Sequence, residues 1–145
     1  MHCAVGSSFL HLAHVLRALV RDHGPSLQAN ARFAAGSDYH RERLHAAPDL
    51  EVWLLSWLPG QITPIHDHGG AITLTAVLSG TLIDERFART RGLTVRPTGT
   101  VHRRPGELEP IDFAMVHRVR PLGRAISLHV YAPACADGQV YEVAA

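Results

Sequence analysis

The chain has 145 residues, 46% of them hydrophobic and 19% charged, as expected for a soluble globular protein with one core. A formal net charge of +1 and scattered arginines exclude a nucleic-acid-binding patch and a polybasic membrane anchor. Two cysteines, Cys3 and Cys135, do not form a disulfide framework, so we expect a cytoplasmic protein, and 11 histidines favour metal or acid–base chemistry.

An amphipathic helix is predicted over residues 7–23, ended by Gly24 and Pro25. This N-terminal region has no basic start or cleavage site and is interrupted by polar residues. We therefore expect neither a signal peptide nor a transmembrane helix. Apolar residues recur along it at helical spacing: Phe9, Leu12, Leu16 and Leu19.

Short apolar runs separated by glycine and proline follow from Glu51 onward. None has helical periodicity, so they predict an all-β fold, a small jelly-roll-like β-barrel with a short N-terminal helical region. We expect a single domain over residues 1–145, with a helical lead at 1–35 and the barrel at 36–145. The predicted strands are 51–58, 71–80, 81–87, 93–97, 98–104, 112–120, 125–133 and 139–143.

Two histidines, His66 and His68, stand one residue apart in a strand-like segment. Side chains at positions i and i+2 of a strand share one face, so both imidazoles point the same way. Two inward imidazoles repel each other when charged and are costly when unpaired. A divalent cation held between them removes both problems, and we therefore predict a metal site.

The histidine pair lies inside a glycine frame that resembles the first cupin motif. Gly60 precedes the pair and Gly80 follows it at the spacing of the motif, but Thr73 stands where cupins commonly carry a glutamate ligand. The pattern alone leaves two histidines as candidates for the third metal ligand. His117 follows a Pro-Gly turn and a short run, whereas His102 fits the second cupin pattern P-x-G-x2-H.

Four blocks between residues 39 and 133 resemble the thiol dioxygenases, and most of all cysteine dioxygenase. The most specific is the Ser-x-His-x-Tyr run in the last block. The blocks are YHRERL (39–44), similar to the family's Tyr-x-Arg block; WLPGQITPIHDHGG (57–70), similar to W-x-PG-x4-PIHDH; VHRV (116–119), similar to IHRV; and SLHVYAP (127–133), similar to SLHxYSP.

The resemblance implies a non-haem iron enzyme of cysteine metabolism with a cupin fold. It would insert both atoms of O2 into the sulfur of a small thiol and give a sulfinate. One Fe(II) per chain would be held by three histidines, with His117 favoured over His102 as the third. The implied metal ligands are His66, His68 and His117.

The resemblance also implies roles around the metal. Arg41 would bind the substrate carboxylate, although Arg43 lies on the same side of its strand and remains an alternative. Tyr131 would place its hydroxyl near the thiol and O2. Ser127 and His129 share a strand face with Tyr131 and would orient it. Trp57 is a further candidate for the substrate pocket.

L-Cysteine is the favoured substrate, because relatives that act on 3-mercaptopropionate commonly carry glutamine where Arg41 stands. In animal cysteine dioxygenases a cysteine at the position of Thr73 forms a thioether with the active-site tyrosine, so here Tyr131 is expected to be unmodified. Three alternatives remain: a dioxygenase of another thiol such as 3-mercaptopropionate, a non-catalytic metal- or ligand-binding cupin, and a zinc or manganese isomerase. We expect no nucleic-acid or membrane partner, and a monomer or weak homodimer.

Overall fold

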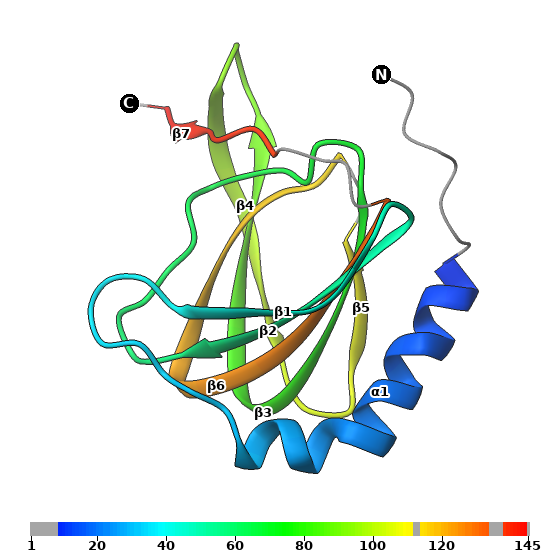
Figure 1. Ribbon diagram of the computed structural model, residues 1–145. Helices are drawn as coiled ribbons and strands as arrows, with labels where there is room; N and C mark the ends of the chain where they lie inside the picture. Colours follow the sequence, from blue (N-terminus) through cyan, green and yellow to red (C-terminus); the bar gives the residue numbers. More distant parts are fainter. Residues whose placement is uncertain (1–8, 112–113, 134–137, 145) are drawn as a thin grey trace.

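The computed structural model describes residues 9–111, 114–133 and 138–144, which form one helix and seven strands (Figure 1). The strands make one curled sheet in the order β1-β2-β6-β3-β4-β7, and β5 pairs with β3 outside this path. The predicted all-β fold with an N-terminal helix is confirmed. The elements are α1 (Phe9–Ala29), β1 (His40–Ala47), β2 (Leu50–Trp57), β3 (Ile72–Arg89), β4 (Thr94–Arg103), β5 (Leu108–Ile111), β6 (Val116–Ala132) and β7 (Glu142–Val143).

The apolar stripe of α1 covers one side of the sheet. Leu12 and Leu16 are fully buried in a cluster with residues of β2, β3 and β6. This packing stabilises the helix more than its intrinsic propensity does. Residues 7 and 8 of the predicted helix lie outside the described residues. Within the described part of the chain, no helix has the length and apolarity needed to cross a bilayer.

The predicted helix end is wrong, because α1 continues through Pro25 to Ala29. A proline inside a helix removes a hydrogen bond and costs about 3 kcal/mol or more. Tertiary packing offsets this cost here, because Gly24 is buried and Leu27 packs against the same apolar cluster as the rest of the helix. The local stop signal of Gly24 and Pro25 is thus overridden by core contacts at Gly24 and Leu27, although the rest of the last turn is exposed.

Three pairs of predicted strands are single long strands in the structure. The strand β3 covers most of the predicted strands 71–80 and 81–87, and β4 covers most of 93–97 and 98–104. The strand β6 covers the predicted strands 112–120 and 125–133 from Val116 to Ala132, and residues 112–113 of that prediction lie outside the described residues. At Gly80 the chain bends without leaving the sheet: its φ is +77°, and a Cβ there would lie 2.2 Å from the carbonyl oxygen of Arg124. Only glycine fits this close approach, so it curves the strand instead of ending it.

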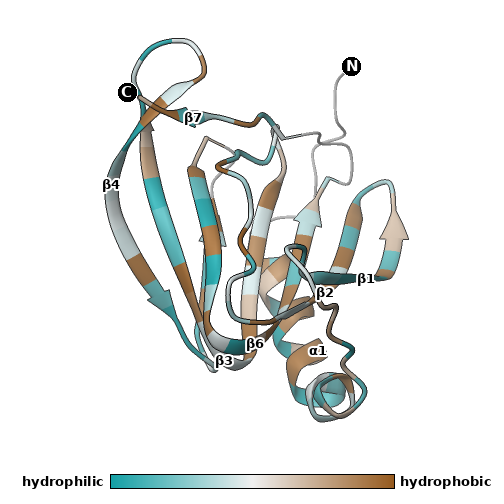
Figure 2. Cartoon of the chain, turned by 90° about the vertical axis from the view of Figure 1, so that its left-hand side faces the viewer, coloured by the Kyte–Doolittle hydropathy of each residue, from teal (hydrophilic) through white to brown (hydrophobic). Residues whose placement is uncertain are grey.

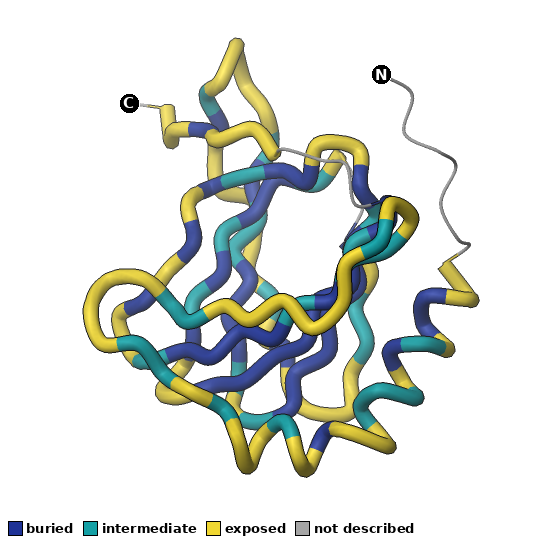
Figure 3. The backbone as a smooth tube through the Cα atoms, in the orientation of Figure 1, coloured by how far each residue is buried: buried dark blue, intermediate teal, exposed yellow. Residues whose placement is uncertain are grey.

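The two longest strands, β3 and β6, pair antiparallel along most of their lengths and form the back of the barrel. Polar and apolar bands alternate along the strands (Figure 2), and the central strands are buried whereas β1 is mostly exposed (Figure 3). Near one end of the barrel the inner face becomes polar: Thr73 and Thr75 of β3 lie opposite Tyr131 and His129 of β6. This end carries the candidate site.

Candidate metal centre

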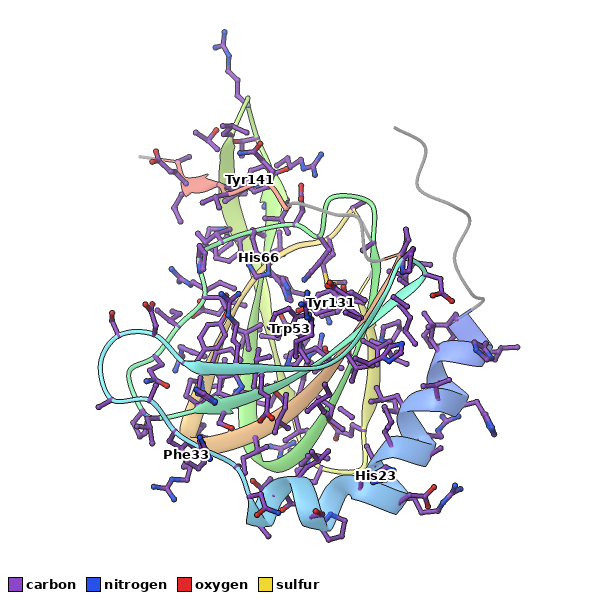
Figure 4. The ribbon with its side chains drawn as sticks, in the orientation of Figure 1. His23, Phe33, Trp53, His66, Tyr131 and Tyr141 are labelled. Atoms are coloured by element: carbon purple, nitrogen blue, oxygen red, sulfur yellow. The ribbon has the colours of Figure 1, made fainter. Side chains whose placement is uncertain are left out.

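Three imidazoles meet inside the curled sheet. His66 and His68 come from the segment between β2 and β3, and His117 comes from the start of β6. Their ring centroids lie 4.8 to 4.9 Å apart, and one nitrogen of each lies within 4.8 Å of the others. Backbone hydrogen bonds in both directions, 2.9 and 3.0 Å, join His66 to His117. Figure 4 shows His66 in the enclosed space with Tyr131 and Trp53.

The structure brings His117, and not His102, to the histidine pair. His117 is buried, whereas His102 lies on β4 with an exposed side chain. The next residue, Arg103, points inward, and alternation along the strand turns His102 outward. Within the described ranges the group contains histidines alone, and Thr73 is buried opposite Tyr131.

In His66 and His117 one ring nitrogen is used in a hydrogen bond, and this shows which nitrogen is left to bind a metal. The Nδ1 of His66 donates to the carbonyl oxygen of Pro64 at 2.8 Å, so its Nε2 carries the lone pair. The Nδ1 of His117 donates to Oδ1 of Asp84 at 2.9 Å, and its Nε2 is buried without a partner among the described residues. A divalent cation satisfies such a nitrogen, so the residues fit a metal. Imidazole donors suit iron, zinc, copper and nickel alike.

Burial keeps His66 and His68 in the neutral form that can bind a metal. It lowers the pKa of His68 to about 3, with the charges of His117 and His66 as further causes. Burial is also the main cause that lowers the pKa of His66, followed by His117. The same effect lowers the pKa of His129 to about 3, with the Arg103 charge second.

These shifts predict that the metal-free protein loses stability in mild acid. Above the unfolded pKa of 6.5 both states are neutral, and the full stability is present. Between pH 6.5 and about 3, unfolded chains bind protons at His68 and His129 that the folded state does not. The free energy of unfolding should therefore fall by up to about 1.4 kcal/mol per pH unit for each histidine.

Urea denaturation at several pH values between 7.5 and 5 measures this slope. The substitution His129→Gln should flatten it, and the matched change His102→Gln, at an exposed histidine, should leave it unchanged. An equal slope in wild type and His129→Gln would contradict the assignment.

A buried ion pair, which no sequence motif indicated, supports His117. Asp84 is fully buried on β3, and Arg103 on β4 is 3% exposed and donates to its Oδ2. Burial opposes ionisation of Asp84, but the hydrogen bond from His117 and the charge of Arg103 together hold the pKa of its carboxyl below the usual value. The carboxylate is therefore ionised and accepts the proton of His117.

Asp67, between the two histidines, anchors their loop. Its Oδ1 accepts the backbone N–H of Gln139 at 2.9 Å, and its Oδ2 accepts the hydroxyl of Tyr141 at 2.7 Å and the guanidinium of Arg89 at 3.1 Å. These contacts fix the segment before β7 against the loop that carries two of the three histidines.

Ser127, His129 and Tyr131 share the inner face of β6, but no hydrogen bond joins His129 to Tyr131 in the described part of the chain. Ser127 Oγ lies 2.7 Å from Nε2 of His129, whose Nδ1 lies 3.3 Å from Oγ1 of Thr75. Both ring nitrogens of His129 thus have partners other than Tyr131. The ring of Tyr131 lies nearly parallel to that of His129, with centroids 6.4 Å apart. His129 therefore supports Tyr131 by packing.

A cavity of about 430 Å³ opens onto His66 and His68, and Arg41 and Tyr131 line it, whereas His117 borders a smaller inner cavity. Arg41 has no carboxylate within ion-pair distance in the described part of the chain, and its guanidinium lies 5.8 Å from the ring centroid of Trp53. Arg43, the alternative, has its NH1 3.7 Å from Oε1 of Glu51. The structure therefore leaves the charge of Arg41, and not that of Arg43, available to a ligand.

Trp57 lies deeper than expected. It is fully buried, its indole N–H donates to Ser127 Oγ at 3.0 Å, and its ring stacks on Tyr39. It lines a small inner cavity, and the outer cavity is lined instead by Trp53 and Tyr39. The wall also contains Glu51, which accepts the indole N–H of Trp53 at 3.2 Å and which no sequence motif had indicated.

A family model described as cysteine dioxygenase type I matches residues 11–143 of the chain. The match includes the histidine group, the cavity wall formed by β1 and β2, and the strand with Tyr131. It covers more than nine tenths of the sequence.

Solved bacterial structures share the fold. A Klebsiella pneumoniae protein with a double-stranded β-helix domain is 20% identical, with a TM-score of 0.66 over 79% of this chain and 88% of that chain. A Thermus thermophilus protein is 21% identical (TM-score 0.60, 74% and 93%), and a cupin superfamily protein from Desulfitobacterium hafniense is 15% identical (0.55, 68% and 81%). At these identities the likeness shows the fold alone, and it confirms the predicted cupin barrel.

Proposed function

Because the chain belongs to the cysteine dioxygenase type I family, we propose that it is an Fe(II)-dependent thiol dioxygenase whose substrate is L-cysteine. The reaction converts R–SH and O2 to R–SO2H, so both oxygen atoms are retained on sulfur. One observation carries the proposal: the cavity that exposes His66 and His68 of the converging histidine group is also lined by Arg41, which has no carboxylate partner in the described ranges.

His66, His68 and His117 would hold the iron. The bound ion lowers the pKa of a coordinated thiol and holds the thiol and O2 next to each other. Because all three ligands are neutral imidazoles, the protein leaves the charge of the ion uncompensated. This favours a substrate that itself supplies a negative sulfur.

Arg41 would orient the substrate through its carboxylate. A guanidinium fork matches the two oxygens of a carboxylate and binds them through charge-assisted hydrogen bonds. The same cavity wall carries the carboxylate of Glu51, so it presents charge of both signs. L-Cysteine, with an amino group beside its carboxylate, matches this wall better than 3-mercaptopropionate, which has no amino group.

Tyr131 would act as a hydrogen-bond donor to the reacting atoms. Burial raises the pKa of its phenol, and the nearby Tyr39 and Glu51 raise it further against the opposing charge of Arg41. The hydroxyl therefore keeps its proton at neutral pH and can donate it to developing negative charge. The ring centroid of Tyr131 lies 5.9 Å from that of His68, so Tyr131 lies next to the group of three histidines.

The test is reconstitution of the protein with Fe(II) under anaerobic conditions, followed by measurement of O2 uptake with L-cysteine, 3-mercaptopropionate or cysteamine. We expect one O2 consumed per L-cysteine, formation of cysteine sulfinate, and slower uptake with the other two thiols. Protein loaded with Zn(II) is the control for uncatalysed oxidation. Tight metal binding without thiol-dependent O2 uptake would contradict the proposal and indicate a non-catalytic cupin.

A further inference from the structure

The buried pair formed by Asp84 and Arg103 requires an explanation, because charged side chains are almost never fully buried without a specific partner. Removing two charges from water costs more than their mutual attraction often returns. The two residues lie on adjacent strands in neighbouring register positions, since Leu82 pairs with Arg103 and Asp84 pairs with Val101. Stability alone is therefore a weak explanation for burying this pair.

Both oxygens of the Asp84 carboxylate are occupied. Oδ1 accepts the Nδ1 proton of His117 at 2.9 Å, and Oδ2 accepts a guanidinium proton of Arg103. The carboxylate is thereby fixed at both ends and cannot rotate away from the imidazole. Because it accepts, the proton of His117 must reside on Nδ1, and the buried, unpartnered Nε2 is left with its lone pair.

Arg103 has few other contacts that explain its place. Its Nε and NH1 are buried and lack hydrogen-bond partners in the described part of the chain, and its NH2 lies 3.6 Å from Oε2 of the half-buried Glu109. The hydrogen bond to Asp84 is thus the main polar contact of the buried guanidinium. It keeps the carboxylate ionised and cancels its charge, so the support adds no net charge to the metal site.

The other two histidines have weaker support. The Nδ1 of His66 meets the carbonyl oxygen of Pro64, a neutral acceptor, and the Nδ1 of His68 is buried without a partner among the described residues. Among the described residues, His117 is the one histidine of the three whose ring contacts a carboxylate. It also comes from a strand remote from the other two, so its orientation depends most on a fixed partner.

We propose that Asp84 and Arg103 are positioning residues of the metal site, which set the tautomer and orientation of His117 before a metal binds. This inference rests on the metal site of the proposed function, but not on its thiol chemistry. Carboxylate partners of metal-binding histidines fix the ring and raise its basicity, and losing one typically costs about 10- to 100-fold in metal affinity.

The first measurement is the dissociation constant for Co(II) and Fe(II), determined by competition with a chelator, together with the absorption spectrum of the Co(II) form. We expect Asp84→Asn to weaken metal binding about 10- to 100-fold and to change the Co(II) spectrum, because an amide can present either an oxygen or an NH2 group to His117. The matched control is Glu109→Gln, which removes a carboxylate near the same Arg103 nitrogen without touching His117. It should bind metal like the wild type.

Asp84→Asn takes the hydrogen-bonded carboxylate from buried Arg103 and leaves it only Glu109 at 3.6 Å, so this variant also tests whether the fold tolerates the loss. The double variant Asp84→Asn/Arg103→Met removes both charges, and we expect it to fold and still bind metal about 10- to 100-fold more weakly. Wild-type affinity and a wild-type Co(II) spectrum in the folded double variant would overturn the proposal.

Nitrogen NMR of zinc-loaded wild-type protein gives a readout that needs no variant. We expect the Nδ1 of His117 to carry the proton and its Nε2 to bind the metal, and the opposite tautomer would overturn the inference. Failure of the wild type to bind any metal would overturn both proposals. Metal binding with the expected tautomer but without thiol-dependent O2 uptake would overturn the proposed function alone.

Discussion

Replacing His117 with glutamine is expected to reduce Fe(II) affinity by at least about 100-fold and to bring thiol-dependent O2 uptake to background. Loss of a supporting contact costs up to about 100-fold, so loss of a ligand should cost more. The glutamine fills a similar volume but offers no aromatic nitrogen in the group of three imidazoles. Competition with a chelator gives the affinity, and an oxygen electrode gives the rate.

The matched control is His102→Gln, which removes an exposed histidine from β4, the strand separated from β6 by β3. Its affinity for Fe(II) and its rate should equal those of the wild type. The reverse pattern, with His102→Gln inactive and His117→Gln active, would show that the third ligand has been assigned to the wrong histidine.

The substitution Arg41→Met is expected to lower kcat/KM for L-cysteine by about 100-fold or more. Hydrogen bonds to charged groups contribute about 1.5 to 3 kcal/mol each, and a guanidinium can form two with one carboxylate. Most of the loss should appear in KM, because the carboxylate is bound in the ground state as well as in the transition state. Cysteamine, which has no carboxylate, should be oxidised at the same rate by wild type and variant.

Arg43→Met serves as the control, because Glu51 already compensates the charge of Arg43. This variant should retain kcat/KM for L-cysteine within about threefold, the range expected for an exposed ion pair. If Arg43→Met were the impaired variant instead, the substrate carboxylate would bind Arg43, two residues further along β1, and not Arg41.

The fold was largely predictable because burial in this chain follows local patterns. Helical spacing around Leu12 and Leu16 and the short apolar runs predict the helix and the buried strands correctly. The strand β1 was absent from the apolar runs because most of its side chains are exposed, and it is held by pairing with β2. The continuation past Pro25 and the bend at Gly80 depend on packing against distant segments, which no local signal reports.

The site was predictable to the extent that its geometry is local. The i, i+2 spacing places His66 and His68 on one face, whereas the choice between His117 and His102 depends on which way two distant strands face. Asp84 and Arg103 could not be found, because a charged residue in an alternating strand is ordinarily read as exposed. Their inward orientation becomes visible only once β3, β4 and β6 are in register.

The anchoring of Asp67 also determines when the site can form. Asp67 contacts Gln139 and Tyr141, which lie 72 and 74 positions later in the chain. During synthesis, the loop with two of the three histidines therefore emerges from the ribosome well before the residues that hold it in place. Contacts over so long a separation carry a large loop-closure entropy and form late in folding. The anchored form of this loop is therefore available to a metal ion only after the chain has been synthesised through Tyr141.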